Sequence, residues 1–74
     1  MQNNQMINLA IMGIGTIGKR HLMAINTIEN LNLCGIVDLT EEARSFCNDN
    51  KISFFDDLNE LKKSTKVDGV IIST

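Results

Sequence analysis

Three glycines at fixed spacing, in the hexapeptide Gly13-Ile14-Gly15-Thr16-Ile17-Gly18, constrain the fold of this 74-residue chain more than any other feature. The hexapeptide directly follows the apolar run Ile7–Met12, which predicts a buried strand. It opens a segment, from Thr16 to about Asn30, in which apolar residues recur every three or four positions and predict a helix. A strand, a glycine-rich turn and a helix are therefore expected to follow one another.

The rest of the chain continues this alternation. Apolar runs at residues 31–37, 52–55 and 69–73 predict three more strands. Thr40 is expected to cap a helix that reaches about Asp49, and Asn50 to close it in the left-handed conformation. Asp57 and Glu60 have the spacing of a capping box at the start of a short third helix.

Strands that alternate with helices in this way predict an α/β fold with a parallel sheet. Right-handed crossovers give the strand order 3-2-1-4, with helices on both faces of the sheet. The fourth strand is then an apolar edge that no further strand protects.

Each glycine of the hexapeptide has a separate expected role. Gly13 permits a tight turn, Gly15 lets a pyrophosphate approach the backbone, and Gly18 lets the helix lie close to the sheet. The unpaired N–H groups around Thr16 and Ile17 face an anionic ligand with the helix dipole behind them. The context predicts dinucleotide binding. The alternative is a glycine turn that serves packing alone.

Asp38 ends the second predicted strand, about 20 residues after the last glycine of the turn. Its carboxylate is expected to accept hydrogen bonds from the adenosine ribose and to repel a 2′-phosphate. Leu39 and Thr40 follow it without an arginine, so NAD(H) is predicted as the cofactor rather than NADP(H). The alternative role, helping to cap the next helix, is compatible with ribose binding.

Composition excludes several classes of function. A net charge of −2 provides no cationic surface for nucleic acid. The N-terminal residues lack the basic segment of a signal peptide and no apolar run is long enough to cross a bilayer, so we expect a cytoplasmic protein without a membrane partner. Cys34 and Cys47 fit no metal-ligand spacing and are read as reduced structural thiols, so no metal site is expected.

With these residues placed, the chain closely resembles the N-terminal part of the Gfo/Idh/MocA family of oxidoreductases, over essentially its whole length. Residues 13–21 resemble the family's GxGxxGxxH, and residues 67–74 resemble its VDAVIIATP. Val37-Asp38 and Phe55-Asp56-Asp57 with Leu61 match two further patterns. The resemblance implies that residues 1–74 are the incomplete N-terminal part of a dinucleotide-binding Rossmann domain. The rest of that domain and a C-terminal substrate domain would lie outside this sequence.

The resemblance also implies a cofactor-facing role for Ser73 and Thr74, because the loop that follows them in the family lies beside the nicotinamide. The predicted cofactor-binding set is then Gly13, Ile14, Gly15, Thr16, Ile17, Gly18, Asp38, Leu39, Ser73 and Thr74. Family members oxidise or reduce a carbinol carbon of a sugar, inositol or sugar derivative, and the full-length protein is expected to be a homo-oligomer.

No catalytic residue is assigned, because the family's catalytic lysine and histidine have no counterpart in this sequence. His21 is interpreted as a packing and hydrogen-bonding residue. Arg20 either reaches a phosphate or is solvated. Two alternatives to an oxidoreductase remain: a noncatalytic NAD-binding module such as a redox sensor, and a residual fragment that binds no ligand.

Overall fold

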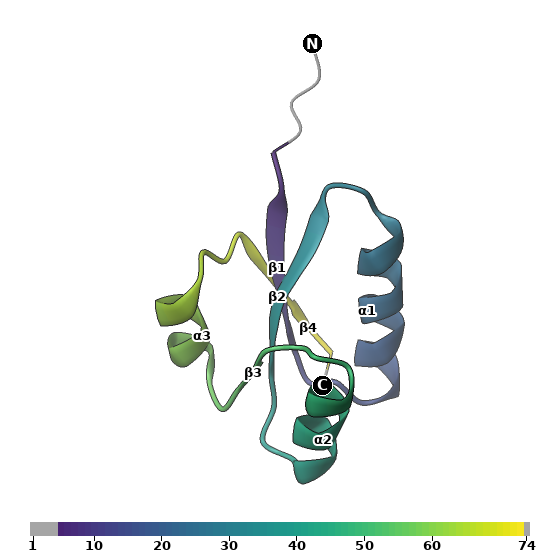
Figure 1. Ribbon diagram of the computed structural model, residues 1–74, viewed down its shortest axis with the longest axis vertical. Coiled ribbons are helices and arrows are strands. Elements are labelled where there is room, and N and C mark those ends of the chain that lie inside the picture. The colour runs from purple at the N-terminus through teal and green to yellow at the C-terminus, as the bar shows by residue number, and fades with distance from the viewer. Residues whose placement is uncertain (1–4, 74) are drawn as a thin grey trace.

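A computed structural model describes residues 5–73, and strands and helices alternate along it from the first strand to the last (Figure 1). The strands are β1 (Ile7–Met12), β2 (Leu31–Val37), β3 (Phe54–Phe55) and β4 (Gly69–Ile72), and the helices are α1 (Thr16–Thr27), α2 (Glu41–Asp49) and α3 (Leu58–Ser64).

The strands form one sheet in the order β3-β2-β1-β4, and every pair is parallel, which confirms the predicted α/β class and strand order. β1 and β2 occupy the inner positions and are the longest strands. The register between them shifts after Leu9, which pairs with Leu33, because Ala10 pairs with Gly35 and leaves Cys34 as a bulge.

Helices cover both faces of the sheet, as predicted. α1 and α2 lie on one face and α3 lies on the other (Figure 1). The core is correspondingly divided into two clusters. The larger one joins Ile11 and Ile36 of the sheet to Leu22, Ile25, Ala43 and Cys47 of α1 and α2. The smaller one joins Ala10 and Val37 to Leu61 of α3, with Cys34 packed against it.

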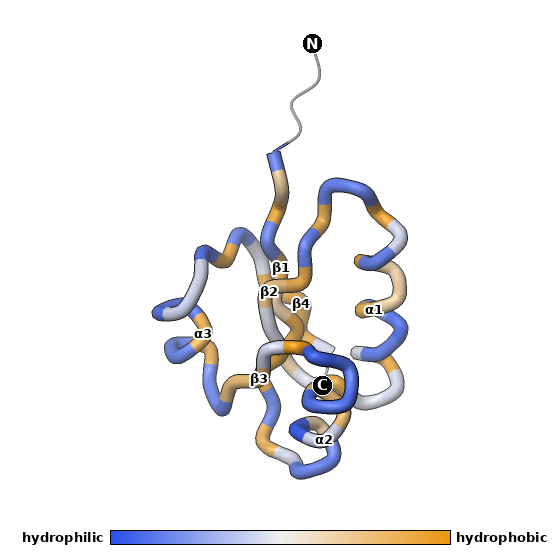
Figure 2. The backbone as a smooth tube through the Cα atoms, viewed as in Figure 1, coloured by the Kyte–Doolittle hydropathy of each residue, from blue (hydrophilic) through white to orange (hydrophobic). Residues whose placement is uncertain are grey.

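Hydropathy along the backbone follows this layering: the strands are mostly apolar, whereas the ends of the helices and the turns are polar (Figure 2). Ile11 and Ile36 are fully buried, and burying a side chain of this size contributes roughly 1.5–3 kcal/mol. β4 is the exception, since Ile72 remains 70% exposed at the edge of the sheet. Within residues 5–73, no helix combines the length and the apolar character that crossing a bilayer requires.

Helix α1 ends three residues earlier than its apolar spacing predicts. Ile28 has extended backbone angles, and its N–H still bonds to the carbonyl of Ile25. The N–H of Leu31 then bonds back to Ile28, while the carbonyl of Asn30 accepts from Ile7 of β1. The segment after Thr27 is therefore a turn that sets the start of β2 beside β1.

Helix α2 ends at Asp49, as predicted, but the left-handed residue that follows it differs from the prediction. Lys51, with a φ of 57°, takes the left-handed conformation expected of Asn50. Asn50 instead donates its side-chain amide to the carbonyl of Phe46. Asn50 is nevertheless the C-cap of α2, and the N–H of Ile52 bonds to the carbonyl of Cys47 beyond it. Strand β3 is shorter than the predicted 52–55.

The start of α3 confirms half of the predicted capping box. Asp57 accepts a hydrogen bond of 2.8 Å from the N–H of Glu60. The carboxylate of Glu60 lies 3.4 Å from the ammonium of Lys63 on the next turn, rather than reaching back to Asp57. Strand β4 ends at Ile72 instead of Ser73, although the N–H of Ser73 still bonds to the carbonyl of Met12.

Candidate functional site

The glycine turn joins the carboxyl end of β1 to the start of α1, as the sequence predicts. Gly13 has a φ of 89°, a conformation that residues with a side chain rarely adopt. A Cβ added to Gly18 would collide with the carbonyl of Gly13, so this glycine brings α1 close to the end of β1. A Cβ at Gly15 would meet nothing within 4 Å, so the backbone there faces open space.

The first turn of α1 is open to an acceptor from outside the helix. Gly15 is its N-cap, no side chain caps it, and no acidic residue lies in its first turn. By contrast, Thr40 and Asp57 cap α2 and α3 with their side chains. The N–H groups at the start of α1 carry the positive end of the helix dipole, and this arrangement is typical of sites that bind phosphate.

Asp38 follows β2 directly and bridges the two loops at this end of the sheet. Its Oδ2 accepts a hydrogen bond of 2.9 Å from the N–H of Ile14. Its Oδ1 accepts from the N–H of Leu39 at 2.7 Å and from that of Thr40 at 3.1 Å. Burial on its own would raise the pKa of the Asp38 carboxyl, but these backbone hydrogen bonds outweigh it and lower the pKa. The carboxylate is therefore ionised and fixed.

Sequence reasoning missed the bond between Asp38 and Ile14, because it depends on how two loops meet in space. It did identify Thr40 as the cap of α2, where the hydroxyl accepts from the N–H of Ala43 at 3.1 Å. Asp38 bonds to the two residues just before that helix, which favours the structural role that the sequence also allowed. Ile14 is buried in the core and its N–H is already engaged by Asp38.

Cavities flank Asp38 on both sides. One of about 320 Å³ lies toward α3, and its apolar walls include Met12, Leu39 and Leu58. The other, of about 270 Å³, lies between α1 and α2 and is lined by Lys19 and Glu42 among others. Leu39 is 84% exposed, so its side chain is available to a ligand in the first cavity.

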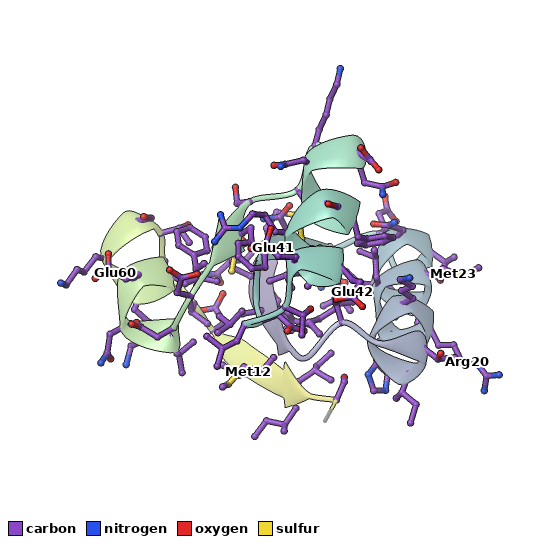
Figure 3. The ribbon with its side chains drawn as sticks, turned by 90° about the horizontal axis from the view of Figure 1, so that it is seen from below. Met12, Arg20, Met23, Glu41, Glu42 and Glu60 are labelled. Atoms are coloured by element: carbon purple, nitrogen blue, oxygen red, sulfur yellow. The ribbon has the colours of Figure 1, made fainter. Side chains whose placement is uncertain are left out.

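Ser73 lies at the same end of the sheet, immediately after β4. Its hydroxyl is 2.7 Å from Nδ1 of His21 on α1, which agrees with the predicted hydrogen-bonding role of His21. Thr74 lies outside the described residues. Arg20 and Met23 point away from the sheet on the outer side of α1 (Figure 3), so Arg20 is a solvated side chain in this conformation.

The structure thus gathers the turn, Asp38, Leu39 and Ser73 at the carboxyl ends of parallel strands, where doubly wound sheets bind their ligands. No three His, Cys, Asp or Glu side chains within residues 5–73 lie close enough to hold a metal ion. Three features together define a dinucleotide-binding module of the Rossmann type: the sheet order, the glycine turn on an inner strand, and the acid after the next strand.

The chain belongs to the Gfo/Idh/MocA family: residues 7–74 match the family described as "Oxidoreductase family, NAD-binding Rossmann fold". This match confirms the resemblance, and with it an NAD(P)-binding domain of the oxidoreductase class. A comparison with curated proteins found no match.

Solved structures agree with this assignment. An NAD-binding protein from Listeria innocua is 26% identical and superimposes over 95% of this chain with a TM-score of 0.84. GenD2 from gentamicin A biosynthesis, solved in complex with NAD, is 20% identical over 95% of this chain, with a TM-score of 0.82, and its likeness shows the fold. The matched regions make up 21% and 20% of those two chains, so this chain spans about a fifth of their length.

Proposed function

We propose that this chain binds NAD(H) as the N-terminal part of a cofactor-binding domain in a longer oxidoreductase. That enzyme would transfer a hydride between nicotinamide and a carbinol carbon of a sugar, inositol or sugar derivative. One observation carries the proposal: the open N-terminus of α1 and the fixed carboxylate of Asp38 converge at one end of the sheet. Membership of an NAD-binding oxidoreductase family supports it.

The residues at the turn fit a dinucleotide. The open space beside Gly15 gives a pyrophosphate room to approach the backbone, and Thr16 and Ile17 present N–H groups at the positive end of the helix. Asp38 is held by backbone N–H groups before any ligand arrives, so it needs no reorganisation to accept ribose hydroxyls. The apolar cavity between Leu39 and Leu58 suits a flat base such as adenine.

The charges around Asp38 favour NAD(H) over NADP(H). A 2′-phosphate on the ribose would lie beside the Asp38 carboxylate, with Glu42 lining the neighbouring cavity. Lys19 lines the same cavity, but its ammonium lies 4.8 Å from the centre of the Phe46 ring, and it offsets only one of the two carboxylates.

The bound cofactor would supply the hydride chemistry, and the residues of this chain would bind and orient it. We assign no proton-transfer group to the described residues. The catalytic groups, the substrate site and the homo-oligomer contacts belong, in this proposal, to the remainder of a longer cytoplasmic protein.

NADH fluorescence titration of the folded chain tests the proposal. Gly15→Val should abolish binding, because its side chain projects into the open space beside Gly15, where a Cβ meets no protein atom within 4 Å. Asp38→Ala should weaken NAD(H) binding by about ten- to a hundredfold, the loss expected for charge-assisted hydrogen bonds. It should also reduce the difference between the affinities for NAD(H) and NADP(H). Met23→Ala, on the outer side of α1, is the matched control and should bind normally.

Circular dichroism would establish that each variant is folded. If affinity for both nucleotides is unchanged in Gly15→Val, the nucleotide binds elsewhere and the proposed site is wrong. If the folded wild-type chain binds no nucleotide at millimolar concentration, the proposal fails and the chain retains the fold alone.

A further inference from the structure

His21 makes a side-chain contact that crosses the fold. Its Nδ1 lies 2.7 Å from Oγ of Ser73, a residue 52 positions further along the chain. Both side chains are partly buried. Within residues 5–73 we find no other side-chain hydrogen bond between α1 and β4 or the residue that follows it.

Ser73 is consequently held from two sides. Its N–H donates to the carbonyl of Met12 at 2.8 Å and extends the pairing between β1 and β4 by one residue. Its hydroxyl is held by His21, which lies one turn of α1 beyond the glycine turn. The end of β4 is thereby fixed relative to the backbone on which a pyrophosphate would rest.

The strand order dictates where an extended dinucleotide must run. Asp38, at the end of β2, would hold the adenosine ribose, and the turn at the end of β1 would hold the pyrophosphate. A ligand that continues in the same direction passes from β1 to its other neighbour, which is β4. Ser73 is the described residue at that end of β4.

We propose that His21 is a positioning residue for the second half of the dinucleotide. Through the hydroxyl of Ser73 it fixes the end of β4 against α1, and so sets the surface on which the nucleoside beyond the pyrophosphate rests. This inference depends on the proposed function, because it takes the dinucleotide path from the assigned roles of Asp38 and the glycine turn.

Calorimetric titration of the chain with NAD⁺ and with ADP tests this role, because ADP lacks the second nucleoside. His21→Leu removes the hydrogen bond and should weaken NAD⁺ binding by about three- to tenfold, with ADP binding changed by less than about twofold. His21→Asn keeps a polar group near the position of Nδ1 and should restore most of the lost affinity. Met23→Leu, on the outer side of the same helix, is the matched control and should bind both ligands as the wild type does.

Ser73→Ala should give the same selective loss as His21→Leu. The double variant should bind NAD⁺ no more weakly than either single variant, because both changes remove one interaction. Additive losses would show that His21 does not act through Ser73 and would overturn the proposal. Equal losses for NAD⁺ and ADP, accompanied by a lower melting temperature, would show a purely structural tie and would also overturn it.

The wild-type titrations separate this inference from the function on which it rests. If the folded wild type binds neither NAD⁺ nor ADP, the proposed function fails and this inference fails with it. If it binds both ligands and the His21 variants affect neither, only the positioning role is refuted.

Discussion

Replacing Asp38 by asparagine should destabilise the fold even when no nucleotide is present. The carboxylate accepts from three backbone N–H groups, those of Ile14, Leu39 and Thr40. Asparagine has one acceptor oxygen, so if that oxygen keeps the two loop N–H groups, its amide NH₂ faces the N–H of Ile14. Two donors then meet in a partly buried position and one hydrogen bond is lost.

The magnitude follows from that single bond. The bonds that Leu39 and Thr40 donate to Asp38 are exposed, so water can accept from these N–H groups if Asp38 does not. The bond that Ile14 donates is partly buried, so its loss sets the magnitude. A hydrogen bond to a charged group is worth about 1.5–3 kcal/mol. For a chain of this length the whole free energy of unfolding is roughly 4–11 kcal/mol. The melting temperature should therefore fall by roughly 6–24 °C.

Urea unfolding at pH 7, followed by far-UV circular dichroism, measures this loss. Asp56→Asn is the matched control, because the Asp56 side chain is 69% exposed and pairs with Arg44 at the surface. That change should cost less than about 1 kcal/mol. Equal losses for the two variants, or no loss in Asp38→Asn, would refute the argument that Asp38 holds the two loops together.

Two further predictions concern the same end of the sheet. Because the pKa of Asp38 is lowered in the folded chain, its stabilising contribution is present above about pH 4 and is lost as the pH falls through the folded pKa. The free energy of unfolding, measured from pH 6 to pH 3, should therefore fall more steeply in the wild type than in Asp38→Asn. Gly18→Ala places a Cβ against the carbonyl of Gly13 and should cost roughly 1–3 kcal/mol in thermal unfolding. Gly15→Ala, which meets no atom, should cost less than about 1 kcal/mol; equal costs for the two would contradict the packing role of Gly18.

The order of elements was predictable because it depends on patterns that are local in sequence. Each element has its own local signal. Examples are the apolar run Ile7–Met12 for a strand, the periodic segment after Thr16 for a helix, and the cap at Thr40 for the next helix. The strand order then follows from the handedness of parallel connections, which is independent of side-chain detail.

Element ends were less predictable, because competing hydrogen bonds decide them. Ile28 continues the apolar spacing of α1, yet it leaves the helix so that the chain can turn toward β2. Lys51, rather than Asn50, takes the left-handed conformation, and the N–H groups of Lys51 and Ile52 both bond back to carbonyls of the last turn of α2. Cys34 is bulged in β2, so that Leu33 and Ile36 face the same side of the sheet.

The candidate site was predicted as a set of residue types, and its internal bonds were not. The spacing of the glycines and Asp38 identifies positions, because each position follows from the chemistry of one residue in one element. The bonds from Asp38 to Ile14 and from His21 to Ser73 join residues 24 and 52 positions apart. No periodicity links such residues, so only the assembled sheet reveals which of them meet.

The sheet also separates the two thiols of the chain. Cys34 packs toward α3 and Cys47 is buried beneath α2 on the opposite face, so no disulfide can close within one molecule. Burial raises the pKa of both thiols, with Asp68 adding to the effect at Cys34 and Asp38 at Cys47. Thiols held in their protonated form react slowly with oxidants and with other disulfides. The folded chain therefore keeps Cys34 and Cys47 as separate thiols on opposite faces of its sheet.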